Sequence, residues 1–147
     1  MAVGYIEIYG TGTQAGNKTE IKSITSVFAP ENGCSRAYNI PLYIRTVKSN
    51  VGYGEAAASI IVFIKIILVF QKAIIPLYIG IKIRLNPSLP DLTNRNMVIP
   101  YTATSWEPGK KPRLVIVNNF GAAGRNISII VKEAKLRPRI GEDTRQV

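Results

Sequence analysis

The sequence predicts a mixed α/β domain, and two features of its patterning carry this prediction. Short β-rich segments recur along the chain, "GYIEIYG" at 4–10, "PLYIRTV" at 41–47 and "RLVIVNN" at 113–119. Two longer segments between them have apolar residues at helical spacing. The chain has 147 residues, 46% of them hydrophobic, which is enough for the core of one ordinary domain. We therefore expect one domain that contains both strands and helices.

In the first third of the chain, a strand and a helix flank a glycine-rich turn. "GYIEIYG" alternates and runs into the turn "GTGTQAGN". Apolar residues then recur three and four positions apart, at Ile21, Ile24, Val27 and Phe28. This spacing predicts a helix over 19–29, with Thr19 available as its N-cap. The following stretch, "ENGCSRAYN", predicts a polar loop in which Cys34 is an ordinary thiol.

The rest of the chain predicts one long helix and three further strands. After the strand at 41–47, "SNVGYG" forms a turn into a helix from about Glu55 to Lys72. That helix is apolar on nearly all sides, so we expect it to be buried on several sides. Residues 76–112 predict mostly loop with short extended pieces, and "FGAAGR" joins strands at 113–119 and 126–134.

Composition argues against several classes of function. The formal charge is +10, but the cations are scattered and have no interleaved aromatic residues, so nucleic-acid binding is not expected. One cysteine and no histidine make a disulfide framework or a metal site improbable, and they favour a reducing, cytoplasmic compartment. The apolar run 57–70 is shorter than the ~20 residues that a bilayer needs, and Lys65 lies near its centre. We therefore expect a buried helix and no membrane association.

Three local patterns occur in a fixed order, "EIYGTGTQAGN", "VKSNVGYGEAA" and "VNNFGAAGRN". Together, with "QKAIIPLYIGIK" between them, they resemble the C-terminal half of a ketosynthase (β-ketoacyl synthase) domain, most closely that of fungal iterative non-reducing polyketide synthases. The resemblance implies a thiolase-like α/β fold, of which this chain would be only the C-terminal half. Residues 1–134 would then be the ketosynthase part, and 135–147 would begin a linker toward an acyltransferase domain.

The resemblance also implies a chemistry. Ketosynthases carry out a decarboxylative Claisen condensation of acyl and malonyl thioesters, in which a cysteine holds the acyl group and two histidines assist decarboxylation and stabilise the enolate. The cysteine belongs to the N-terminal half, and the two histidine positions fall on Tyr9 and Tyr53. A phenol with a pKa near ~10 is a poor base at neutral pH and cannot carry the charge of an imidazolium. We therefore expect this copy to be inactive.

Other positions match the family's pattern. Lys48 matches a lysine of the site, although a lysine exposed at a strand end would look the same. Thr11 and Thr13 match threonines that bind the phosphopantetheine arm of an acyl carrier protein, although a plain turn role is the alternative. The oxyanion turn would be Phe120, Gly121 and Ala122. The expected partners are an acyl carrier domain and the missing N-terminal half, in a homodimeric family whose ketosynthase domain binds no cofactor of its own.

The departures from the family's residues share one pattern, because each can arise by a single C-to-T or G-to-A change in a codon. They are Tyr9, Tyr53 and Tyr78 for His, Asn17 for Asp, Lys22 and Lys132 for Glu, Arg45 and Arg125 for Gly, and Leu77 for Pro. We interpret this pattern as decay by transition mutation, which also explains the basic charge. Arg45 and Arg125 are expected to add strain or buried charge if they cannot reach water.

Three hypotheses stay open from the sequence. The first is a catalytically dead remnant of a ketosynthase. The second is a binding or scaffolding fragment that still recognises the acyl-carrier arm. The third is an active enzyme that uses Tyr9 and Tyr53 or completes its site with a separately encoded N-terminal half.

Overall fold

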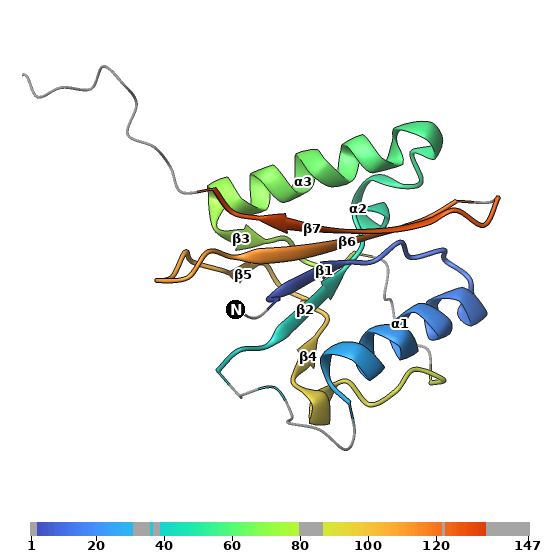
Figure 1. The fold of residues 1–147 in the computed structure, drawn as a ribbon, viewed down its shortest axis with the longest axis horizontal. Coiled ribbons are helices and arrows are strands. Elements are labelled where there is room, and N and C mark those ends of the chain that lie inside the picture. Colours follow the sequence, from blue (N-terminus) through green and yellow to red (C-terminus); the bar gives the residue numbers. More distant parts are fainter. Residues whose placement is uncertain (1–2, 31–35, 37–38, 80–86, 122, 135–147) are drawn as a thin grey trace, which may run out of the picture.

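The computed structural model describes residues 3–30, 36, 39–79, 87–121 and 123–134. A five-stranded sheet in the order β4-β2-β1-β6-β7 forms its centre (Figure 1). The strands are β1 (Tyr5–Glu7), β2 (Leu42–Arg45), β4 (Met97–Val98), β6 (Leu114–Phe120) and β7 (Asn126–Lys132). β1 pairs in parallel with both β2 and β6, β2 pairs in parallel with β4, and β7 runs antiparallel to β6. The predicted strands are confirmed to within a few residues at their ends.

Two helices cover opposite faces of this sheet, α1 (Gln14–Phe28) and α3 (Ala58–Lys72) (Figure 1). Successive side chains of β1 alternate between the faces, as the period of a strand requires. Ile6 packs in a cluster with Ile21 and Ile24 of α1, whereas Tyr5 packs with Ile66 and Val69 of α3. The sheet thus lies between two apolar layers, and the expected mixed α/β class is confirmed.

The N-terminus of α1 differs from the sequence prediction. The helix begins at Gln14, and the Thr13 hydroxyl caps it by accepting the Gly16 N–H at 3.1 Å. Thr19, the predicted N-cap, lies inside the helix, and its hydroxyl donates to the Ala15 carbonyl at 3.0 Å. The prediction was wrong because residues 14–18 are mostly polar and show no apolar spacing, while the cap lies within the glycine-rich turn.

The apolar helix also differs from its prediction. A 3₁₀ turn, η1 (Glu55–Ala57), precedes α3, and only Lys65, Ile66 and Val69 of α3 are buried. Five large apolar side chains of the helix are exposed: Ile60, Phe63, Ile64, Ile67 and Leu68. Burial on several sides is therefore not observed, because within the described residues the helix buries only the stripe that faces the strands. Among these residues no helix is long and apolar enough to cross a membrane.

The remaining elements are short. α2 (Lys48–Val51) follows β2, while β3 (Ile74–Ile75) and β5 (Thr104–Ser105) form an antiparallel pair. η2 (Thr93–Arg95) precedes β4. Residues 76–112 are loop with short extended pieces wherever they are described, as predicted.

Candidate active site

Three of the predicted site residues meet where β1 and β2 end. Tyr9 follows β1, Lys48 begins α2 just after β2, and Tyr53 lies in the turn after α2. The carboxyl ends of neighbouring parallel strands meet at one edge of a sheet, so the topology brings these residues together. The hydroxyl oxygens of Tyr9 and Tyr53 are 3.5 Å apart. Tyr9 is half-buried, whereas the Tyr53 side chain is 62% exposed.

Lys48 is half-buried, and it lies against the two tyrosines rather than in open solvent. Its ammonium group donates to the Tyr9 carbonyl and lies 3.4 Å from the centre of the Tyr9 ring and 5.5 Å from that of Tyr53. A lysine ammonium over aromatic faces is stabilised by the ring quadrupoles. Burial lowers the pKa of Lys48, against the opposing effect of the carboxylates of Glu20 and Glu7. The structure thus gathers Tyr9, Lys48 and Tyr53 into one group.

The protonation of Tyr9 limits what this group can do. The hydrogen bond with Tyr53 and, to a smaller degree, burial raise the pKa of the Tyr9 phenol above its ordinary value. At neutral pH the phenol keeps its proton and can donate a hydrogen bond, but it cannot serve as a general base. The arrangement therefore suits hydrogen bonding to an oxygen and does not suit proton abstraction.

The predicted oxyanion turn lies beside Tyr9. The Phe120 ring packs against the Tyr9 ring with 5.6 Å between their centres. The Gly121 N–H already donates to the Arg125 carbonyl at 2.8 Å, so this amide is not free for a ligand. Ala122, whose backbone amide is the expected oxyanion donor, lies outside the described residues, as do Cys34 and the predicted linker at 135–147. The Arg125 side chain is exposed, so it reaches water and adds no buried charge.

The two threonines lie on the same loop as Tyr9. Thr11 and Thr13 are exposed, and their hydroxyl oxygens are 3.0 Å apart. Thr13 also caps α1, and the Thr11 hydroxyl is within 3.4 Å of the Asn17 side-chain oxygen. Both hydroxyls thus have a role in the turn, and both still face solvent beside the site.

The sequence analysis missed the residue that fixes the Tyr9 loop, Glu20. Its carboxylate is buried and accepts the N–H groups of Tyr9 at 2.8 Å and Gly10 at 3.0 Å. The Asn118 side-chain amide donates to the same carboxylate at 3.2 Å. A carboxylate that accepts backbone N–H groups positions a loop strongly. The sequence contains one sign of this burial, because Glu20 directly precedes Ile21 on the apolar side of the predicted helix.

A cluster of buried charged residues lies beneath the site. Glu7 is fully buried and accepts hydrogen bonds from Tyr5, the Val47 backbone and Lys65, the last at 2.6 Å. Burial lowers the pKa of Lys65 to about 8, against the opposing effect of Glu7. Arg45, next to Glu7 in the sheet, is also fully buried, as expected for a cation that cannot reach water.

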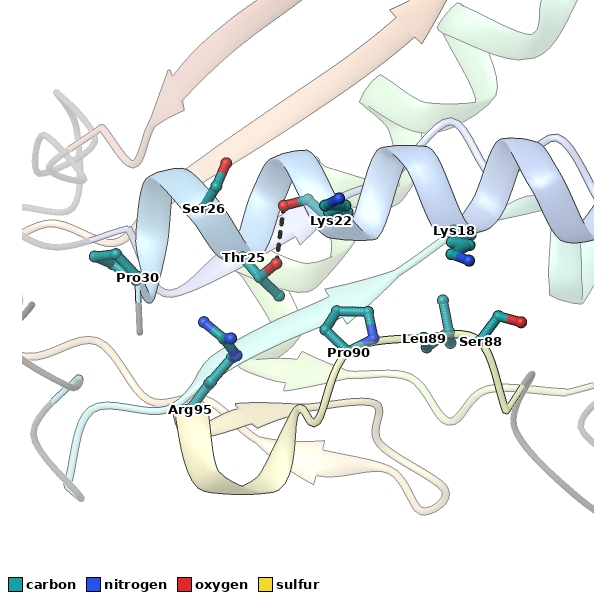
Figure 2. Close-up of a pocket in the computed structure, with 9 residues that line it drawn as sticks. All are labelled: Lys18, Lys22, Thr25, Ser26, Pro30, Ser88, Leu89, Pro90 and Arg95. Carbon is teal, nitrogen blue, oxygen red and sulfur yellow. Dashed lines mark hydrogen bonds between the residues drawn. The ribbon is translucent and has the colours of Figure 1, made fainter. Parts of the chain in front are cut away.

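A separate hollow of about 470 Å³ lies between α1 and the segment 88–95 (Figure 2). Lys18, Lys22 and Arg95 line it, and Arg95 donates to the Ala29 carbonyl at 2.5 Å. None of the predicted site residues lines this hollow. Among the described residues no group of His, Cys, Asp and Glu could hold a metal ion.

Residues 1–82 match the family described as beta-ketoacyl synthase, C-terminal domain. The chain belongs to this family, and the predicted ketosynthase resemblance is confirmed.

Its relatives narrow the class. The chain is 60% identical over 148 residues to the non-reducing polyketide synthase PKS19 of Phaeosphaeria nodorum. The aligned region covers 99% of this chain and 8% of that protein. It is 55% identical over 147 residues to the non-reducing polyketide synthase gsfA of Penicillium aethiopicum, again with 99% and 8% covered. The chain thus spans about 8% of the length of these curated relatives. The expected similarity to fungal non-reducing polyketide synthases is confirmed.

Solved structures agree on the fold. An oxazolomycin ketosynthase domain of Streptomyces albus superposes with a TM-score of 0.76 at 30% identity, over 92% of this chain and 22% of that one. The ketosynthase from module 6 of the bacillaene synthase of Bacillus subtilis gives a TM-score of 0.77 at 26% identity, over 91% and 23%. The expected thiolase-like α/β fold is confirmed, and the chain corresponds to one part of such a domain.

Proposed function

We propose that this chain is the C-terminal part of the ketosynthase domain of a polyketide synthase and that its condensation site is inactive. Condensation of acyl and malonyl thioesters is the activity that the family implies. The relatives are multidomain proteins of which the chain spans about 8%, which supports an N-terminal ketosynthase half and an acyl carrier domain as partners. We extend the proposal to the division at residue 134, to a homodimer and to a cytoplasmic location.

The observation that carries the proposed inactivity is the pair of tyrosines. Tyr9 and Tyr53 occupy the two positions at which the family uses histidine, and their hydroxyls lie 3.5 Å apart beside Lys48. Decarboxylation needs a group that exchanges protons or carries positive charge near neutral pH, and an imidazole does both. A tyrosine side chain does neither, so the site keeps hydrogen-bond donors and loses its proton-handling groups.

The carrier-arm positions support the family assignment rather than the activity. Thr11 and Thr13 are exposed beside Tyr9, within reach of an arm that enters the site from solvent. Under this proposal the ketosynthase part binds no cofactor of its own, and phosphopantetheine arrives on the carrier domain. Phe120, Gly121 and Ala122 match the family's oxyanion turn, next to which the thioester oxygen would lie.

A hybrid enzyme tests this proposal. The segment of the Phaeosphaeria nodorum relative that aligns with this chain is replaced by this chain, and product from malonyl thioesters is measured by mass spectrometry. We expect no product from the hybrid and measurable product after the double change Tyr9→His and Tyr53→His. The matched control is Tyr101→His, which changes an exposed tyrosine outside the site and leaves the hybrid silent. Product from the unchanged hybrid, or a silent reverted hybrid, would contradict the assignment of the defect to the two tyrosines.

A further inference from the structure

The helix that carries Lys48 is too short to hold its own position. α2 spans four residues, Lys48–Val51, and no side chain caps its N-terminus. Its internal hydrogen bonds include those from Asn50 N–H and Val51 N–H to the Val47 carbonyl, at 2.9 and 3.2 Å. A single turn of helix is unstable alone, since nucleation fixes several residues for few hydrogen bonds. Something outside α2 must therefore fix it.

Apolar packing does not supply this support on the side that faces α3. A hollow of about 470 Å³ lies between the two helices, lined by Val47 and Val51 on one side and by Ile61, Ile64 and Leu68 on the other. A hollow removes the close contacts through which packed side chains usually fix an element. The position of α2 therefore depends on polar contacts.

Two buried charged residues supply those contacts, one at each end of α2. The Glu7 carboxylate accepts the N–H of Val47, just before the helix. The Arg45 guanidinium donates through Nη2 to the side-chain oxygen of Asn50, near its end. Glu7 and Arg45 are register partners on β1 and β2, so both contacts start from the rigid centre of the sheet.

Arg45 has further contacts that fix its own direction. Its Nη1 donates to the Pro76 carbonyl, and its guanidinium lies 5.4 Å from the centre of the Tyr78 ring. The Asn50 amide donates in turn to the Leu77 carbonyl at 3.3 Å. Arg45 and Asn50 together connect α2 to the segment 76–78.

The guanidinium of Arg45 is incompletely satisfied, which fits an arginine at a position where the family commonly has glycine. Its Nε is buried and has no hydrogen-bond partner. The buried cluster also holds two cations, Arg45 and Lys65, against the single carboxylate of Glu7. A buried unpaired donor and an excess charge both destabilise a fold.

We propose that Arg45 is a positioning residue for Lys48, which it holds against Tyr9 by fixing the far end of α2. This inference rests on the proposed function in one respect, namely that Lys48 belongs to the site. It concerns the position of Lys48 rather than turnover, so it can be tested on the inactive chain itself.

The test measures the titration of the Lys48 amine in the full chain at high dilution. Lysine amines are labelled competitively with an acylating reagent across a pH series, and each site is quantified by mass spectrometry. In the unchanged chain, burial keeps the pKa of Lys48 below the ordinary lysine value. In Arg45→Met we expect the labelling midpoint of Lys48 to rise toward that ordinary value, because released α2 exposes the amine to water.

Arg113→Met is the matched control. Arg113, directly before β6, is a second buried arginine, and its guanidinium pairs at 2.5 Å with Glu133, directly after β7. Its loss should destabilise the chain without moving the Lys48 midpoint. Equal midpoints in the two variants would overturn the proposal, since Arg45 would then have no effect on the position of Lys48.

Two surface variants keep the test decisive if Arg45→Met does not fold. Asn50 is exposed, so Asn50→Ala removes the acceptor without disturbing the core, and Asn50→Asp keeps an acceptor oxygen for Arg45. We expect Asn50→Ala to raise the Lys48 midpoint and Asn50→Asp to preserve it. An unchanged midpoint in Asn50→Ala would overturn the proposal. The hybrid-enzyme result does not affect this outcome, so failure of one proposal is distinguishable from failure of the other.

Discussion

At the scale of single residues, Lys65 shows how the sheet accepts charge in its core. Its ammonium reaches the fully buried Glu7 carboxylate from α3 at 2.6 Å, while Arg45 lies close enough to oppose the charge of Lys65. Burying the Lys65 ammonium costs more free energy than its ion pair with Glu7 recovers, and the pKa of Lys65 therefore falls to about 8. The charged lysine therefore destabilises the fold at neutral pH.

This shift predicts an unusual dependence of stability on pH. Between about pH 8 and the ordinary lysine pKa of about 10.4, the unfolded chain binds more protons than the folded chain. The free energy of unfolding should therefore rise with pH, by about 2 kcal/mol between about pH 7.5 and 9.5. Urea unfolding at high dilution measures this rise. Lys65→Met should remove most of it, and a flat profile in the unchanged chain would contradict the prediction.

Residue roles could be predicted from the sequence only where a motif marks them. The ordered motifs identified Tyr9, Lys48 and Tyr53, and the structure brings these three together. Glu20 carried no such mark, because a glutamate on a helix is usually solvated and its burial depends on the Tyr9 loop above it. The contact between Arg45 and Asn50 was equally hidden, since it forms only when β2 turns back into α2.

At the scale of elements, the start of α1 depends on a tight turn. Thr13 caps the helix, and a Cβ on Gly16 would lie 2.3 Å from the Thr11 hydroxyl oxygen and 2.8 Å from that of Thr13. Glycine at position 16 thus lets two hydroxyls approach the first turn of the helix. The sequence predicted the helix from its apolar spacing, but spacing does not reveal where a polar first turn begins.

The cap can be tested with a matched pair of threonine variants. Thr13→Ala should lower the free energy of unfolding by about 1 kcal/mol, because it leaves the Gly16 N–H without its partner. Thr13→Ser should keep the cap. Thr19→Ala, inside the helix, should change stability by less than about 0.5 kcal/mol. Urea unfolding followed by circular dichroism ranks the variants, and a larger effect at Thr19 would restore the original N-cap prediction.

At the scale of the whole molecule, the outer surface of α3 and β7 is unusually apolar. Ile60, Ile64 and Ile67 of α3 are 64%, 52% and 53% exposed, and Ile127 and Ile129, which lie on the α3 side of β7, are 55% and 41% exposed. β7 also has a partner strand on one side only. Large apolar patches and unpaired strand edges promote association. The α/β class could be predicted from the sequence, but an exposed helix could not, because an all-round apolar pattern usually means burial.

We expect the isolated chain to self-associate through this surface. Sedimentation velocity should show species that grow with concentration, and the double change Ile60→Lys and Ile67→Lys should shift the chain toward monomer. Val27→Lys is the control, since Val27 is 69% exposed on α1, on the other side of the sheet. A monomer at all concentrations, or equal effects of the two sets of changes, would contradict the expectation.

The order of strands in the sheet also has a consequence for how the chain is made. β1 lies between β2 and β6, and Tyr5 pairs with Val115, more than a hundred residues later. Pairings between such distant segments close large loops and slow folding. At synthesis rates of about 5–20 residues per second, β1 waits roughly 5–20 seconds before β6 is available to pair with it. The central strand β1 is thus synthesised before β6, its second neighbour, exists. During that interval the ribosome-bound chain has one unpaired edge on β1 that chaperones can bind.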